Sequence, residues 1–145
     1  MNPNDKPTDL VAQLGEIAPI SQGVGTVATS WINIAEFHCV LAEIRTGVLG
    51  GSATVAAKIQ QATSSGGAGA KDVTGKSITA ISTSGQSALI NLRTQELDVN
   101  GGFTFVQLQI TVATAASLVA AAVMGFGPRY QPASLLNDAT VVQVV

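Results

Sequence analysis

The sequence predicts an all-β, single-domain protein built as a β-sandwich or barrel. Apolar and polar residues alternate along several runs of strand length, which is the signature of a half-buried strand. Glycine-rich turn signals separate these runs, and 145 residues suit one domain with its own core. Only 11% of the residues are charged, less than half the usual share of about 25%. We therefore expect much of the surface to be covered by partners.

The expected strands share a buried residue at every second position. The predicted inward residues are Val55, Ala57 and Ile59, then Ala88, Ile90 and Leu92, and finally Val106, Leu108, Ile110 and Val112. Residues 117–126 are apolar on both faces, as is typical of a central strand. Residues 27–34, 37–46 and 76–82 are weaker strand candidates. The turns include Asn100-Gly101, a strong cue for a tight turn.

The two termini are expected to lie outside the sandwich, which we place at residues 25–127. Residues 1–24 are predicted to form an N-terminal arm, either a short helix or an extended segment. Leu10, Val11 and Leu14 have helical spacing, with Thr8 or Asp9 as a possible N-cap. Residues 128–145 contain two prolines, Pro128 and Pro132, and end in a short apolar run. They are predicted to form a C-terminal arm.

Residues Ala70 to Ser77 match a loose form of the phosphate-binding P-loop. That site needs a buried strand leading directly into the loop and a helix beginning at its Gly-Lys-Ser. Here small and glycine residues precede the motif, and β-branched residues follow it. The motif is therefore interpreted as a mobile inter-strand loop, with Lys71 and Lys76 as exposed candidates for contacting an acidic patch.

Composition argues against nucleic-acid and membrane partners. The net charge is −2, and the seven Lys and Arg residues form no basic stripe. The most apolar stretch is well short of the roughly 20 residues that span a bilayer, and the N-terminus has no secretion signal. We expect a soluble protein made in the cytoplasm.

No set of catalytic or metal-binding residues is expected. We therefore expect that the protein is not an enzyme and binds no cofactor. Cys39 is the only cysteine, which excludes an intrachain disulfide, and a buried free thiol is its usual state. His38 is the only histidine, and in a strand it would point away from Cys39. Glu96 and Asp98 beside a turn are a weak calcium candidate, but an aspartate there usually caps the backbone.

Three further residues are candidates for a capsid or oligomer interface. Arg129 and Tyr130 lie between prolines after the last apolar strand, and such anchors are frequent in interfaces. Trp31 is the third candidate. For all three, packing against the sandwich itself is an equal alternative.

Three blocks carry a family resemblance: TGVLGGSATVAAKIQQATSSGGAGAKDVTGKSITAIS, LRTQELDVNGGFTFVQLQITVATAAS and GFGPRYQPAS. In this order they resemble a family of small virion proteins from tailed bacteriophages, over roughly residues 45–135. Some members are capsid cement, or decoration, proteins.

The resemblance implies a jelly-roll fold and a structural role on the capsid exterior. The implied partners are the major capsid protein and further copies of the chain in a dimer or trimer. The alternatives are a receptor- or glycan-binding β-sandwich, or another minor head or tail protein.

Overall fold

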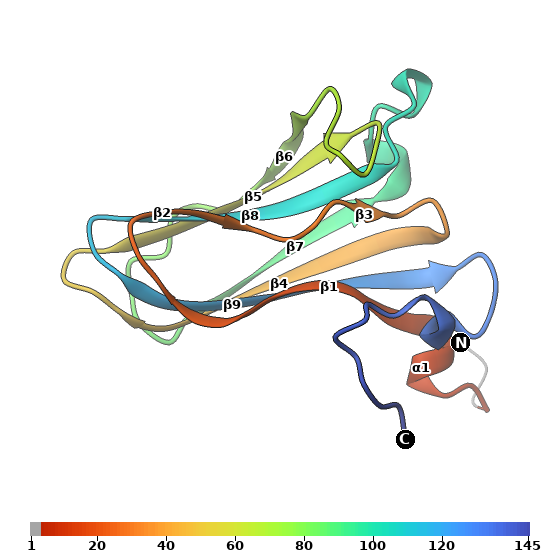
Figure 1. Ribbon diagram of the computed structural model, residues 1–145, viewed down its shortest axis with the longest axis horizontal. Helices are drawn as coiled ribbons and strands as arrows, with labels where there is room; N and C mark the ends of the chain where they lie inside the picture. The colour runs from red at the N-terminus through yellow and green to blue at the C-terminus, as the bar shows by residue number, and fades with distance from the viewer. Residues whose placement is uncertain (1–3) are drawn as a thin grey trace.

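The computed structural model describes residues 4–145 and shows two antiparallel β-sheets packed face to face (Figure 1). The four-stranded sheet has the order β1 (Val11–Gln22), β9 (Ser117–Pro128), β4 (Phe37–Leu49) and β7 (Ser87–Arg93). The five-stranded sheet has the order β2 (Gly25–Ala28), β8 (Phe105–Ala113), β5 (Thr54–Ala62) and β6 (Lys71–Ser77), and β3 (Ile32–Asn33) also pairs with β8. The all-β sandwich predicted from the sequence is confirmed.

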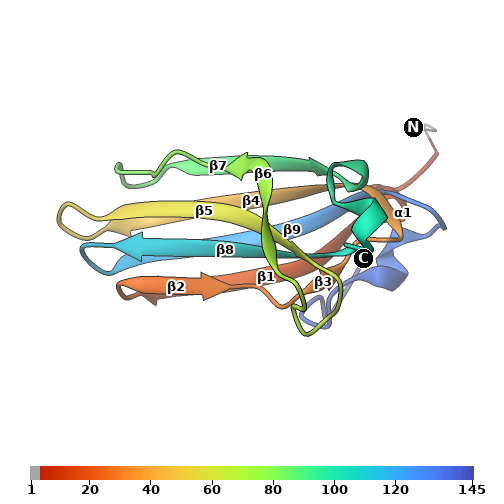
Figure 2. The same cartoon turned by 90° about the horizontal axis from the view of Figure 1, so that it is seen from above.

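The strand order identifies the sandwich as a jelly roll. Because β2 and β3 pair with the same side of β8 in succession, they act as one interrupted strand. Each sheet then combines strands from both halves of the chain, as two nested Greek keys do. Four short helices all lie at one end of the sandwich (Figures 1 and 2). They are α1 (Pro7–Leu10), η1 (Thr94–Glu96), η2 (Val99–Gly101) and η3 (Ala133–Leu136).

The core lies between the sheets and contains the predicted inward residues. Nine of the ten predicted positions are buried; Ala88 is partly buried and packs against the core. Leu89, which interrupts the alternation in β7, points outward and is 59% exposed. β9 lies between β1 and β4, so the prediction of a central strand at residues 117–126 is also confirmed.

The N-terminal region differs from the arm expected at residues 1–24. Among the described residues 4–24, only Pro7–Leu10 is helical, and Val11–Gln22 forms β1, paired with β9 along its length. The pairing shifts register between Gln13 and Gly15, so that Leu14 and Gly15 are both buried. This bulge places Ala12, Leu14 and Ile17 inside, a spacing that resembles a helix in the sequence.

The C-terminal segment, residues 128–145, leaves the sheet at Pro128 and packs back against β1. The backbone N–H of Asp138 donates to the Gln13 carbonyl at 2.6 Å, and the Gln13 N–H donates to Asn137 Oδ1 at 2.9 Å. These two bonds occupy part of the open edge of β1. The last residues extend away from the sandwich, below the four-stranded sheet in Figure 1. Within residues 4–145, no helix has the length and apolar character to cross a bilayer.

Candidate interaction surfaces

Lys71 and Lys76 are not on a mobile loop, and the expectation of one is wrong for this stretch. Residues Lys71–Ser77 form β6, and no helix follows them, so the strand–loop–helix order of a P-loop is not formed here. Lys71 Nζ lies 2.6 Å from Asp98 Oδ2 and 4.2 Å from the centre of the Phe103 ring. Lys71 therefore connects β6 to the η2 turn.

Lys76 links the two sheets. Its Nζ donates to the Asn91 carbonyl of β7 at 2.6 Å and pairs with Glu96 Oε2 at 3.0 Å. Only 18% of its side chain is exposed. Because both lysines are engaged within the protein, neither offers the free positive charge that the sequence suggested.

Trp31 is half-buried between β2 and β3 and contacts the β5–β6 loop. A Cβ on Gly67 would lie 2.5 Å from the indole Nε1, which means that the ring packs directly on that glycine. Gly67 also has φ +79°, a conformation that favours glycine. The tryptophan therefore serves local packing in this structure.

Arg129 and Tyr130 have different environments, although they are adjacent in sequence. Arg129 Nε donates to the Ala35 carbonyl at 2.6 Å, and its backbone N–H donates to the Glu36 carbonyl at 2.8 Å. Arg129 thus ties the exit of β9 to the turn before β4. Tyr130 is 76% exposed, so of the predicted interface residues it is the one that presents an apolar ring to solvent.

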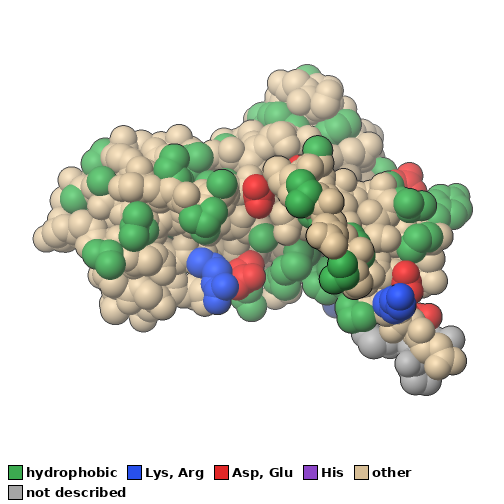
Figure 3. Space-filling view, turned by 60° about the horizontal axis from the view of Figure 1, so that its bottom comes forward, with side chains coloured by type: hydrophobic (Ala, Val, Ile, Leu, Met, Phe, Trp, Pro, Cys, Tyr) green, Lys and Arg blue, Asp and Glu red, His purple; other side chains and the backbone are tan. Residues whose placement is uncertain are grey.

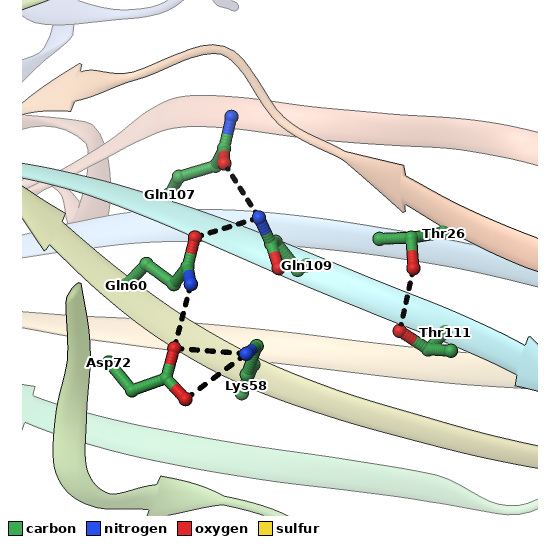
Figure 4. A network of polar contacts seen from close by, with 7 residues as sticks. All are labelled: Thr26, Lys58, Gln60, Asp72, Gln107, Gln109 and Thr111. Carbon is green, nitrogen blue, oxygen red and sulfur yellow. Dashed lines mark hydrogen bonds and ion pairs between the residues drawn. The ribbon is translucent and has the colours of Figure 1, made fainter. Parts of the chain in front are cut away.

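The outer face of the five-stranded sheet carries a hydrogen-bonded polar network (Figure 4). Gln109 Nε2 donates to Gln60 Oε1 at 2.8 Å and to Gln107 Oε1 at 3.1 Å, and Gln60 donates to Asp72 at 2.7 Å. Lys58 pairs with Asp72 at 2.9 Å. Beside this chain of contacts, the hydroxyls of Thr26 and Thr111 lie 2.9 Å apart. These groups satisfy one another within the sheet.

The outer face of the four-stranded sheet has many uncovered apolar side chains, and the sequence interpretation missed it. Four charged residues also point outward from this face, namely Glu16, Glu43, Arg45 and Arg93. Residues 117–126 were expected to be apolar on both faces because the strand is central, but one of these faces has no layer over it. The outward residues of β9 are Leu118, Ala120, Ala122, Met124 and Phe126, and those of β4 are Cys39, Leu41, Glu43 and Arg45. Cys39, expected to be buried, is half-exposed on this face.

Three surface carboxylates stabilise the end of the sandwich that holds the short helices and the β5–β6 region. Hydrogen bonds from Gln60 and Lys58 lower the pKa of Asp72. The Arg93 backbone N–H and then Lys76 lower the pKa of Glu96. Lys71 and the Gly101 N–H lower the pKa of Asp98, which caps η2 as the sequence suggested. Among residues 4–145, no group of three His, Cys, Asp or Glu side chains is arranged to hold a metal ion.

No protein-family model and no curated protein matches the chain. Several solved virus structures have a similar chain arrangement. A chain of the cowpea mosaic virus top component, a naturally occurring empty particle, aligns with TM-score 0.48 and 13% identity over 85% of this chain and 86% of that one. A chain of broad bean stain virus gives TM-score 0.48 and 9% identity over 85% and 88% of the two chains.

A chain of the infectious bursal disease virus Gx strain gives TM-score 0.48 and 16% identity over 92% of this chain, which corresponds to 37% of that longer one. These likenesses concern the arrangement of strands alone. The jelly-roll assignment rests on the strand order of this chain itself.

Proposed function

We propose that this chain is a structural virion protein that acts as a capsid cement protein. It binds the outer surface of a tailed-phage head and stabilises contacts between capsomers of the major capsid protein. The single observation that carries the proposal is the exposed apolar C-terminal segment, anchored on a rigid jelly roll. The ordered sequence blocks over roughly residues 45–135 support the phage origin.

The C-terminal segment combines a fixed base with an uncovered apolar surface. Its base is held by Arg129 on the Ala35 carbonyl and by the two bonds to Gln13. Its exposed residues are Tyr130 at 76%, Leu135 at 81%, Val142 at 93% and Val145 at 105%. Between residues 130 and 145 Asp138 is the only charged side chain. An exposed apolar surface of this kind is typical of an interaction site.

The mechanism of stabilisation is thermodynamic linkage. A subunit that binds the assembled lattice, and binds free capsomers less tightly, adds its binding free energy to the lattice. If one subunit or oligomer touches neighbouring capsomers, the second contact is intramolecular and strengthens attachment. The jelly roll supplies the rigidity that transmits this effect between contacts, since its two sheets share one core.

The test uses heads of the encoding phage prepared without this gene. Purified chain is added, and binding is measured by co-sedimentation and by copy number per head in an electron-microscopy map. We expect many copies on the outer surface and a higher temperature of head disruption. A handful of copies at the tail, or no binding to heads, would refute the cement function.

Two variants test the assigned contact region. Truncation after Asp138 removes the exposed end and keeps the bonds to Gln13, and Tyr130→Ala removes the exposed ring. Both are expected to weaken head binding while the unfolding temperature stays close to that of the full chain. Val24→Ala, at a residue 66% exposed in the β1–β2 turn, is the matched control and should bind normally. Removal of residues 1–18 is unsuitable, because it would delete most of β1.

A further inference from the structure

The outer face of the four-stranded sheet carries a self-complementary arrangement of charge. Few charged side chains lie among the scattered hydrophobic ones in the oblique view of this face (Figure 3). At its centre, Glu43 and Arg45 of β4 form an ion pair of 3.3 Å, with side chains 31% and 72% exposed. Glu43 is level with Ala122 of β9, and Arg45 is level with Ala120.

We propose that two copies of this chain form a dimer by packing these outer faces against each other about a two-fold axis. The axis crosses the strands between the level of Glu43 and Ala122 and the level of Arg45 and Ala120. It places Glu43 of each copy opposite Arg45 of the other, so that the two intramolecular pairs merge into one network of two acids and two bases. A two-fold interface requires this kind of reciprocal match.

The same axis matches shape as well as charge. It places Leu41, two residues before Glu43, opposite Gly47, two residues after Arg45. Gly47 has no side chain, and beside it a hollow of about 270 Å³ is lined by Ile20, Leu118 and Arg45, among others. Leu118 of the same copy lies against Gly47, with its Cβ 3.0 Å from where a Cβ on that glycine would stand, so Leu41 of one copy packs against Leu118 and the hollow beside Gly47 of the other. Both Leu41 and Leu118 would gain an apolar neighbour in place of water.

Small side chains at the centre allow the sheets to approach. Ala120 and Ala122 lie on either side of the axis on β9, and each falls opposite the other residue in the second copy. Farther out, Met124 falls opposite Leu118, which is 45% exposed in the single chain. Stacked sheets pack about 10 Å apart, and alanines at the crossing leave room for the long side chains around them.

A second copy is favoured over a different partner by the balance of charge around the axis. The outward charged residues of this face are two acids, Glu43 and Glu16 of β1, and two bases, Arg45 and Arg93 of β7, so a strongly acidic or basic surface gains nothing by docking here. A copy turned by the two-fold axis satisfies Glu43 and Arg45 at once. This proposal is independent of the cement function, because it concerns the free protein and its test needs no capsid.

Sedimentation-velocity and light-scattering measurements across a concentration series provide the test. We expect the full chain to be a dimer, with Glu43→Arg and Arg45→Glu each weakening dimerisation at least about tenfold, because each puts like charges across the axis. The double charge-swap variant should recover the dimer. Leu41→Ala should weaken it without any change of charge.

Lys58→Asp is the matched control, because it reverses one charge of an exposed ion pair on the outer face of the other sheet. It should leave the dimer intact, and far-UV circular dichroism checks that every variant is folded. A monomer at all concentrations, a trimer, or a dimer unaffected by the two single swaps would overturn the proposal. So would equal weakening by Lys58→Asp.

Discussion

Gly125 in β9 is expected to be the position where a single methyl group damages the core most clearly. It is buried between β1 and β4, paired with Ala12 and Val40. A Cβ there would lie 2.7 Å from Cγ and Cδ1 of Phe37 and 2.7 Å from Leu14 Cδ1. Phe37 is 1% exposed and cannot move aside, so Gly125→Ala forces overpacking of both side chains.

The magnitude follows from two opposing effects. Overpacking a tight core costs about 1–3 kcal/mol, while replacing glycine stabilises by about 0.4–1 kcal/mol through the unfolded chain. Gly51→Ala isolates the second effect, because nothing lies within 4 Å of a Cβ at that exposed turn position. The difference between the two variants should therefore be about 1–3 kcal/mol.

Urea unfolding and thermal unfolding measure this difference. For a domain of this size it corresponds to roughly 3–10 °C in unfolding temperature. The double variant Gly125→Ala with Phe37→Leu should lose less unfolding free energy than the sum of the two single variants, because the smaller side chain at position 37 makes room for the added methyl group. If Gly125→Ala and Gly51→Ala have stabilities equal within about 0.5 kcal/mol, the close contact to Phe37 does not constrain the core as argued.

Three further predictions concern polar groups. Thr29→Val should lower the free energy of unfolding, measured in urea, by about 1–3 kcal/mol, because the buried Leu108 N–H loses its acceptor at 3.1 Å. Thr29→Ser keeps a hydroxyl acceptor and should retain most of the stability. Lys76→Met should lower the free energy of unfolding by about 1–2 kcal/mol, because it removes the contacts that join β6 to β7. Amide hydrogen exchange in β6 should become faster, and unchanged exchange would contradict the bridging role of Lys76. The folded state lowers the pKa values of Glu96 and Asp98, so their ionised forms stabilise it at neutral pH. Stability should fall as the pH drops below about 4 toward the folded-state pKa values, and Asp98→Asn should make that fall shallower.

Alternation predicted the strands whose pairing is regular. β8 alternates buried Val106, Leu108, Ile110 and Val112 with outward residues over its whole length, and no bulge interrupts its pairing with β5. β1 was missed for the opposite reason. The bulge at Gln13–Gly15 shifts the buried side of the strand from even to odd positions, so the local spacing looks helical until β9 is beside it.

The candidate interface residues were less predictable, because side-chain partners come from distant parts of the chain. Lys71 and Asp98 are 27 residues apart, and Arg129 and Ala35 are 94 apart. Such partners cannot be inferred from local spacing, so lysines in a glycine-rich stretch were expected to be free. Tyr130 leaves the sheet between prolines and is 76% exposed, and its place in an interface stays a prediction.

The sequence by itself determined the fold class, the main core positions and the absence of a P-loop, because these depend on local periodicity and on which residues can begin a helix. The tertiary structure decided the rest. It set the jelly-roll strand order, placed β1 in the four-stranded sheet, paired the lysines within the protein and left the outward apolar residues of β9 uncovered. The physical reason is that a strand's second face is buried or exposed according to the layer packed over it, and no stretch of sequence specifies that layer alone.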